Sequence, residues 1–180
     1  MLDKSLRTSS VQRLFLVCPT DCIEQTILND FKGKAFFCTA LGVYFEFDFV
    51  MQSNLWDLIC EQSIKQVVFV TAIDNVFYEN VFNEKLKLNF PADEALAGVK
   101  KRISKHLIQP GVFSSNYHLL VANYLKNQSR RLMSSSYLGS RLRSEKISVN
   151  AYVYDPMKKH FSSCRKTEQM GNLINSISPN

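Results

Sequence analysis

The sequence has few of the residues and motifs that usually mark an enzyme active site. It contains only three histidines, and none of them stands at a metal-binding spacing from another. It also has no G-x-S-x-G elbow, no P-loop and no G-x-G-x-x-G. These absences exclude the standard signatures of an α/β-hydrolase and of nucleotide binding. We therefore assign no catalytic residue from motifs alone.

Long apolar runs are missing as well. No stretch approaches the roughly 18 uninterrupted apolar residues that would span a bilayer, and the first ten residues are polar, without the hydrophobic region of a signal peptide. The five cysteines are an odd number, which favours reduced thiols over a disulfide framework in a chain without an export signal. We expect a cytoplasmic protein that does not contact a membrane.

The residues that are present predict one globular α/β domain. Of the 180 residues, 46% are hydrophobic and 21% are charged, which is typical of soluble domains. We expect the domain to span 1–163 and a polar C-terminal tail to span 164–180.

Buried strands and helical segments alternate along the first half of the chain. Continuous apolar runs at 13–18 and 66–73 are typical of strands covered on both faces. The aromatic stretch 34–49 predicts one or two more strands. Helices are expected near 23–28, capped by Thr20 or Asp21, at 55–62, capped by Ser53 or Asn54, and at 76–86.

The second half is mainly helical and ends in a strand. Helices are predicted at 91–107, 115–131 and 137–144, followed by a strand at 147–154 and a short edge strand at 158–162. Helices of this length between buried strands imply crossover connections. The fold class is therefore α/β, with a central, mainly parallel sheet of four or five strands flanked by helices.

Three stretches carry a resemblance to a known family. They are the strand that ends in Cys18, the segment N-L-W-D-L-I-C-E-Q-S-I-K-Q-V-V-F-V at 54–70, and the C-terminal helices and strand at 123–155, which end in V-N-A-Y-V-Y-D. In order and spacing they resemble the β-class carbonic anhydrases. The resemblance implies that family's fold, an obligate dimer and a zinc-dependent hydration of carbon dioxide.

The positions that the resemblance assigns to the zinc site are mostly occupied by other residue types. Cys18 stands at the first zinc cysteine, whereas Thr20 and Cys22 stand at the aspartate and arginine of the family's Cys-x-Asp-x-Arg motif. Ala72 falls at the ligand histidine and Asn75 at the second ligand cysteine. An alanine and an asparagine supply neither an imidazole nor a thiolate. We expect a catalytically degenerate protein without a cofactor.

Two alternatives remain for this former zinc cleft. Cys18 could act as a thiolate or hold a different metal, zinc included, and so retain some carbonate dehydratase activity. The second alternative is a pocket for a small polar ligand, lined by Cys18, Thr20, Asp21, Thr71 and Asp74. In the simpler interpretation, Cys18 and Cys22 only fill space and Asp74 caps the next helix.

Two surface features suggest partners. The segment 99–146 has ten basic residues and one acid, but aromatic residues are not interleaved with these charges, so we expect solvated helix faces rather than a nucleic-acid site. The aromatic run from Phe36 to Phe49 is unusually apolar. By resemblance to the family, we expect it to pack against a second copy in a homodimer.

Overall fold

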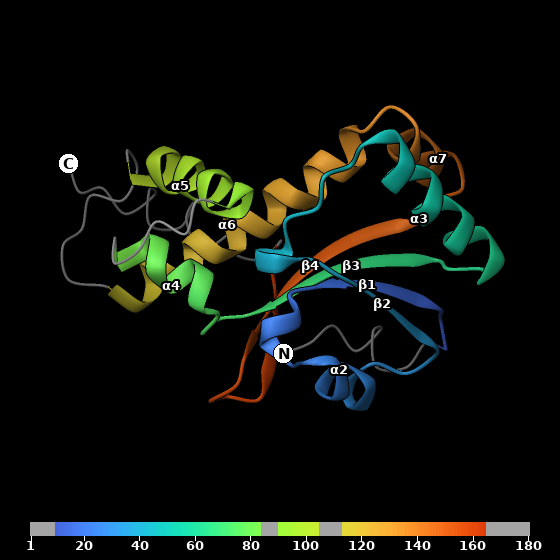
Figure 1. The fold of residues 1–180 in the computed structure, drawn as a ribbon. Coiled ribbons are helices and arrows are strands. Elements are labelled where there is room, and N and C mark those ends of the chain that lie inside the picture. Colours follow the sequence, from blue (N-terminus) through green and yellow to red (C-terminus); the bar gives the residue numbers. More distant parts are fainter. Residues whose placement is uncertain (1–9, 84–89, 105–112, 165–180) are drawn as a thin grey trace, which may run out of the picture.

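The computed structural model describes residues 10–83, 90–104 and 113–164. A five-stranded sheet in the order β2-β1-β3-β4-β5 forms its centre (Figure 1). The strands are β1 (Arg13–Val17), β2 (Ala35–Thr39), β3 (Gln66–Ala72), β4 (Ser148–Asp155) and β5 (His160–Ser163). The first four are parallel and β5 is antiparallel to β4. The predicted α/β class and the mainly parallel sheet are confirmed.

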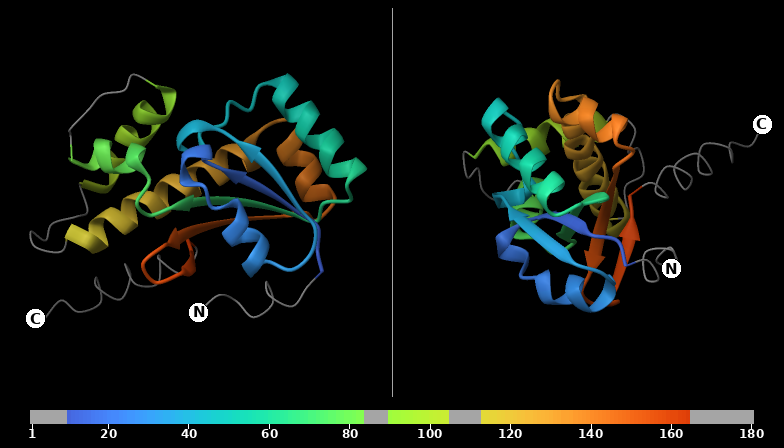
Figure 2. Two further views of the ribbon diagram at one scale, coloured as in Figure 1. Left: turned by 60° about the horizontal axis from the view of Figure 1, so that its bottom comes forward. Right: turned by 90° about the vertical axis from the view of Figure 1, so that its right-hand side faces the viewer.

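The two faces of the sheet are covered by different helices, as Figure 2 shows. One face carries α2 (Glu24–Asp30), and the other carries α3 (Phe49–Glu61), α6 (Phe113–Ser134) and α7 (Leu138–Ser144). Successive residues of β1 serve the two layers in turn, because side chains alternate along a strand. Leu14 and Leu16 belong to the larger core, and Phe15 and Val17 belong to the smaller one.

The remaining helices lie beyond the carboxyl ends of the parallel strands. They are α4 (Val76–Asn83) and α5 (Pro91–Ser104), and two 3₁₀ turns, η1 (Pro19–Asp21) and η2 (Leu41–Val43), follow β1 and β2 at the same edge. In open parallel sheets this edge is where ligands usually bind. The fold therefore places η1, η2 and the start of α4 around one candidate site.

One predicted helix start and the predicted caps of two helices were wrong. Helix α3 begins at Phe49 rather than near Leu55, and its cap is Asp48, whose carboxylate accepts from the Met51 amide at 2.7 Å. Helix α2 begins at Glu24 after Ile23, which provides no side-chain cap. Neither Thr20 nor Asp21 caps it, because both belong to η1 and their side chains bond elsewhere.

The aromatic stretch 34–49 forms one strand, β2, rather than two. After Thr39 the chain turns through η2, where Gly42 and Val43 have φ angles of 60° and 56°. A left-handed conformation suits glycine but is rare for a β-branched residue. Val43 is nevertheless fully buried, so packing of its side chain holds the turn in place.

Several sequence predictions extend beyond the described residues. The predicted helical segments 76–86 and 91–107 each run past the described part of α4 and α5, and 165–180 lies outside it altogether. The first residue of the predicted tail, Cys164, is buried, and its amide donates to the Ala151 carbonyl at 3.0 Å. Among the described helices, none is both long enough and apolar enough to cross a bilayer.

Candidate functional site

The candidate site lies where β1 and β3 end side by side. Because Val17 is paired with Val70 in the parallel register, the residues that follow each strand meet at the same edge of the sheet. This brings the Asp21 side chain, from the turn after β1, into hydrogen-bond contact with Thr71 and Asn75, from the end of β3, while Cys18 contacts Thr20 in the same turn. The predicted clustering of these residues follows from that register.

Asp21 is the centre of this cluster. One of its carboxylate oxygens accepts from the Thr71 hydroxyl at 2.7 Å and from the Ala72 amide at 2.9 Å. The other oxygen accepts from the side-chain amide of Asn75. The carboxylate therefore ties the turn after β1 to the end of β3, directly over the positions that the resemblance assigns to two zinc ligands.

Burial changes the acidity of this carboxyl. Removal from water raises the pKa of Asp21 above its usual range, because desolvation disfavours the charged form. The hydrogen bonds from Thr71, Ala72 and Asn75 oppose that rise, and the nearby Asp74 carboxylate adds to it. The protein thus keeps a carboxyl group here at a desolvation cost that the three donors offset in part.

Cys18 lies deeper than Asp21 and is fully buried. Its sulfur accepts from the Gly42 amide at 3.2 Å and is 3.0 Å from the Thr20 hydroxyl. The Gly42 carbonyl in turn accepts from the Tyr78 hydroxyl at 3.2 Å. Cys18 is therefore held inside a polar chain that links η1, η2 and α4.

Cys22 and Asp74 lie apart from that interior. Cys22 is exposed, with its sulfur 3.7 Å from the Pro19 carbonyl, so the C-x-x-x-C pair consists of one buried and one exposed thiol. Asp74 is also exposed. It does not cap α4, contrary to the simpler interpretation of the sequence, because Asn75 does so by accepting from the Phe77 amide at 2.9 Å.

The donor set does not fit a zinc ion with three protein ligands. Of the thiol and carboxyl groups at these positions and in the turn after β1, Cys18 is fully buried, Asp21 is half-buried and Cys22 is exposed. Ala72 has no donor, and the Asn75 amide is engaged by Asp21 and by the α4 backbone. Within 10–83, 90–104 and 113–164, no group of three or more His, Cys, Asp or Glu side chains is placed to hold a metal.

The sequence did not reveal two residues next to this site. Tyr78 and Tyr124 are buried with ring centroids 5.4 Å apart, and burial raises the pKa of each hydroxyl. Tyr78 is hydrogen-bonded, whereas the Tyr124 hydroxyl has no partner among the described residues. A tyrosine in an apolar helix is usually a core residue, so its spacing alone gave no sign of proximity to Cys18.

Comparison with known proteins gives matches among structures only. No protein-family model and no curated protein matches the sequence. Among solved structures, the β-carbonic anhydrase CafD of the fungus Aspergillus fumigatus is 17% identical with a TM-score of 0.70, over 87% of this chain and 91% of that one. CafA of the same fungus is 16% identical with a TM-score of 0.70, over 96% and 85%.

A third similar structure is one of two tetrameric β-carbonic anhydrases of the ascomycete Sordaria macrospora. It is 12% identical with a TM-score of 0.67, over 86% of this chain and 81% of that one. At these identities the likeness establishes the fold and leaves the chemistry to the residues. The chain has the β-carbonic-anhydrase fold.

Proposed function

We propose that this protein is a catalytically degenerate relative of the β-carbonic anhydrases. In this proposal it forms a homodimer and binds a small ligand or a protein partner, and it does not catalyse the zinc-dependent hydration of carbon dioxide. The observation that carries the proposal is the Asp21 carboxylate. It accepts from Thr71, Ala72 and Asn75, and so occupies the edge where the resemblance places a histidine and a cysteine ligand.

The chemistry of zinc enzymes explains why this matters. A catalytic zinc ion needs three protein ligands and one open position, and it generates hydroxide by lowering the pKa of its bound water. Here the asparagine at the second cysteine position caps α4 and donates to Asp21. Asn75 and Asp21 thus hold the turn after β1 against the end of β3.

A thiol-dependent reaction finds less support in the same geometry. A reactive thiolate needs an accessible sulfur in an electropositive setting. Cys18 is fully buried, and its sulfur is engaged by the Gly42 amide and the Thr20 hydroxyl. We therefore assign Cys18 a structural role, and assign no catalytic residue.

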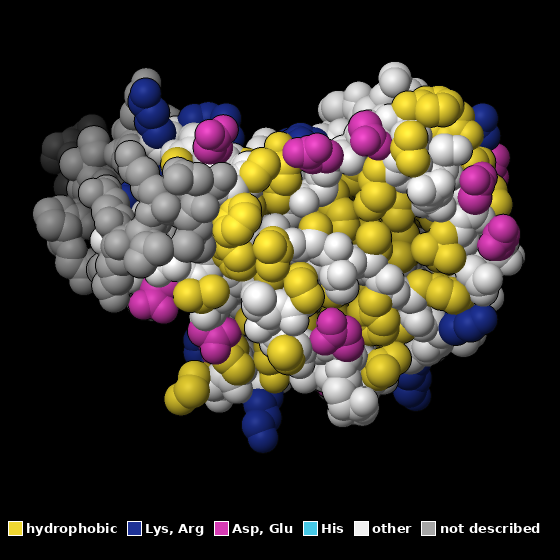
Figure 3. All heavy atoms as spheres, viewed as in Figure 1, with side chains coloured by type: hydrophobic (Ala, Val, Ile, Leu, Met, Phe, Trp, Pro, Cys, Tyr) yellow, Lys and Arg dark blue, Asp and Glu magenta, His cyan; other side chains and the backbone are white. Residues whose placement is uncertain are grey.

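The binding role is supported by the surface. Figure 3 shows hydrophobic side chains gathered across the face that carries β2, η2 and the beginnings of α3 and α4. Large apolar residues on these elements are exposed, namely Leu41, Phe49, Val50 and Val76. Contiguous apolar patches on soluble proteins usually mark interaction sites. We assign this face to a second copy of the chain, and the tetrameric state of the Sordaria macrospora enzymes supports self-association.

The five free cysteines, two of them exposed, support a reducing compartment, which we take to be the cytoplasm.

The first test is metal content together with carbon dioxide hydration. We expect freshly purified wild-type protein to contain no stoichiometric zinc and to show no hydration above the uncatalysed rate. The triple variant D21A/A72H/N75C removes the obstructing carboxylate and supplies the two missing ligands beside Cys18. We expect it to bind one zinc ion per chain, and the additional change C18S to abolish that binding.

Two results with the wild-type protein would contradict the proposal. Stoichiometric zinc in the wild-type protein that is lost in C18S would show that a metal site survives. Hydration activity in the wild-type protein that a chelator removes would restore the enzyme as the primary function. Failure of the triple variant to bind zinc, with its fold intact by circular dichroism, would mean that these positions do not converge on one metal.

A further inference from the structure

Turn η2 carries backbone strain beside the former zinc cleft. Gly42 and Val43 follow each other with φ angles of 60° and 56°. The left-handed conformation suits glycine, but it is unfavourable for a β-branched residue such as Val43. Such strain persists only where the surrounding structure holds it, and it is concentrated at clamps and switch regions. The contacts of η2 therefore decide whether the turn keeps this conformation.

Two hydrogen bonds to Gly42 hold the turn closed over Cys18. The Gly42 amide donates to the Cys18 sulfur at 3.2 Å, and the Gly42 carbonyl accepts from the Tyr78 hydroxyl at 3.2 Å. All three residues are buried, so water does not compete for either bond. One peptide unit of η2 is thus fixed both to the end of β1 and to α4.

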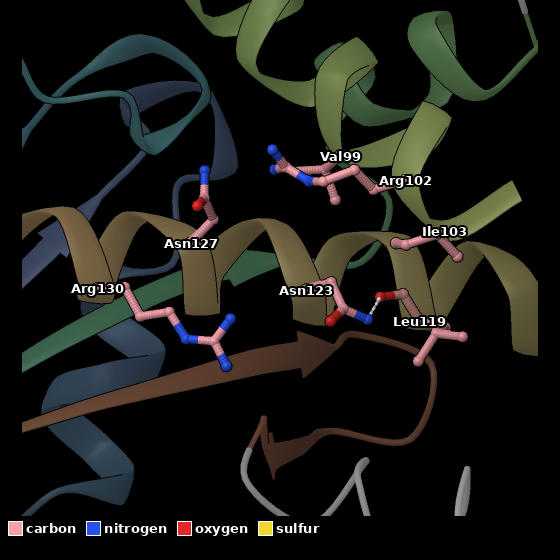
Figure 4. Close-up of a pocket in the computed structure, with 7 residues that line it drawn as sticks. All are labelled: Val99, Arg102, Ile103, Leu119, Asn123, Asn127 and Arg130. Carbon is pink, nitrogen blue, oxygen red and sulfur yellow. Dashed lines mark hydrogen bonds between the residues drawn. The ribbon is translucent and has the colours of Figure 1, made fainter. Parts of the chain in front are cut away.

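Helix α5 supports the turn at one end and borders a hollow at the other. A Cβ atom placed on Gly42 would lie 3.0 Å from the Ala92 Cβ, so the start of α5 packs directly on η2. At the far end of the helix, Arg102 and Ile103 line a hollow of about 360 Å³ between α5 and α6 (Figure 4). The packing of α5 is therefore tight only near η2, which favours local movement of the turn over global unfolding.

The outer side of η2 belongs to the apolar face. Leu41 is 43% exposed, and it lies on the same face as the exposed Phe49 and Val50 at the start of α3 (Figure 3). The residue that a second copy would cover is thus the direct neighbour of Gly42, which covers Cys18. A partner that fits the face only while η2 is closed favours the closed state, because a ligand shifts a conformational equilibrium toward the state that it binds better.

We propose that η2 is a latch that couples occupancy of the apolar face to access to Cys18. In the closed state Gly42 covers the sulfur and Leu41 completes the face. In the open state both bonds to Gly42 break, Val43 leaves its left-handed conformation, and the thiol meets solvent. The inference rests on the homodimer proposed above and deepens it, since the second copy would then control the former zinc cleft.

Alkylation of the Cys18 thiol by iodoacetamide, followed by peptide mass spectrometry, measures opening of the latch. Cys18 is fully buried, so it reacts only from an open state. The measurement uses a C22S background, because Cys22 is an exposed thiol in the neighbouring turn. We expect the rate to be almost independent of urea below the unfolding transition, since a local opening exposes little surface.

Two matched tyrosine variants test the hydrogen bonds. Y78F removes the donor to the Gly42 carbonyl, whereas Y124F removes a hydroxyl without a described partner from the ring packed on Tyr78. We expect Y78F to alkylate Cys18 about fivefold faster, the factor that corresponds to the loss of one hydrogen bond, and Y124F to match the wild type. Because coupling is reciprocal, the Y78F dimer should also dissociate more readily.

Dilution tests the coupling to the apolar face without any substitution in the latch. We expect alkylation of Cys18 to become at least fivefold faster as the dimer dissociates, with sedimentation measured at the same concentrations. F49K/V50K should react at the fast rate at every concentration. M157K changes an exposed residue of the β4–β5 turn and should behave like the wild type.

Three results would overturn the proposal. The first is a Cys18 rate that follows urea as steeply as global unfolding does, or that Y78F leaves unchanged. The second is a dimer whose dissociation, by dilution or in F49K/V50K, leaves the rate unchanged. The third is a wild-type protein that stays monomeric, which contradicts the homodimer and with it the coupling. Loss of the zinc site is judged separately by metal content, so the two failures can be told apart.

Discussion

At the scale of single residues, one carboxyl group determines the character of the former zinc cleft. Asp21 receives three hydrogen bonds from the end of β3, and its two oxygens meet different donors. Thr71 can rotate its hydroxyl, but the Ala72 amide is fixed, and Asn75 is oriented by the bond that its oxygen accepts from Phe77. Each of the two side-chain oxygens of Asp21 must therefore be a hydrogen-bond acceptor.

This requirement predicts a reciprocal pair of mutations. In D21N, the new amide nitrogen faces the Asn75 amide nitrogen, so two donors meet, and we expect the free energy of unfolding to fall by about 1–3 kcal/mol. N75D alone places two carboxylates in contact and should cost at least as much. In D21N/N75D an amide again faces a carboxylate, and the new carboxylate at position 75 can still accept from the Phe77 amide. Urea denaturation of all four proteins should give a favourable coupling energy; simple additivity would show that the contact contributes nothing.

The pH dependence of D21N provides a second readout of the same mutation. Since burial raises the pKa of Asp21 in the folded protein, the folded state binds the proton more tightly than the unfolded state. The contribution of this group to stability is fully present below its unfolded pKa and is lost as the pH rises through its folded pKa. D21N should lack that loss, so its deficit relative to the wild type should be largest in acid and shrink toward neutral pH.

At the scale of elements, helix α6 contains buried polar groups that no described residue satisfies. The hydroxyls of Tyr117 and Tyr124 and the amide nitrogen of Gln128 have no hydrogen-bond partner among the described residues. Tyr124 and Gln128 are four residues apart and fully buried, so they lie on one face of the helix. A buried polar atom without a partner costs about 1–3 kcal/mol relative to a satisfied one.

Two tyrosines that pack on each other allow this cost to be measured. Y124F removes a hydroxyl without a described partner, and we expect the melting temperature to stay the same or rise, by the equivalent of up to about 1 kcal/mol. Y78F removes the donor to the Gly42 carbonyl and should lower stability by about 1 kcal/mol. A loss in Y124F as large as that in Y78F would contradict this expectation and indicate a buried water on Tyr124.

Two strands could be predicted from the sequence, whereas the start of helix α3 could not. The runs at 13–18 and 66–73 became β1 and β3 because strands covered on both faces need continuous apolar residues. The start of α3 was missed because Phe49, Val50 and Met51 continue an aromatic, β-branched stretch that is typical of a strand. The Asp48 side chain, which accepts from the Met51 amide, caps the helix at this position.

The sequence suggested which residues lie near the ends of β1 and β3, but not how they are connected, and whether they form a functional site stays a prediction. The parallel order of β1 and β3 placed Cys18, Asp21, Thr71 and Asn75 at one edge. No pattern in the sequence indicated that Asp21 turns toward β3 instead of capping α2. That choice depends on three donors, Thr71, Ala72 and Asn75, that are 50 or more positions away in the chain.

At the scale of the whole molecule, the exposed apolar face predicts self-association. Phe49 and Val50, at the start of α3, are 69% and 64% exposed. The variant F49K/V50K puts two charges on this face, where they would lose hydration in a dimer. We expect the wild-type protein to sediment as a dimer at micromolar concentration and the variant to dissociate at least tenfold more readily.

A control for this experiment is available on the β4–β5 turn. Met157 is 92% exposed and does not belong to the elements that carry the apolar face, so M157K should leave the dimer unchanged. A wild-type protein that sediments as a monomer at high micromolar concentration would contradict the assignment of this face to a second copy. Equal dissociation of M157K and F49K/V50K would place the interface elsewhere.

Asn75 both caps α4 and donates to Asp21, and this affects which substitutions could introduce a metal ligand here. A single substitution of Asn75 by cysteine would remove the cap of α4 and one donor of Asp21 at once, before any metal could bind in return. A histidine at position 72 alone would still lie beside the Asp21 carboxylate, whose oxygens already accept hydrogen bonds. N75C therefore lowers stability before a metal can bind, whereas D21A removes the carboxylate that occupies this edge of the sheet. The hydrogen bonds that Asp21 accepts thus oppose the formation of a metal site at these positions.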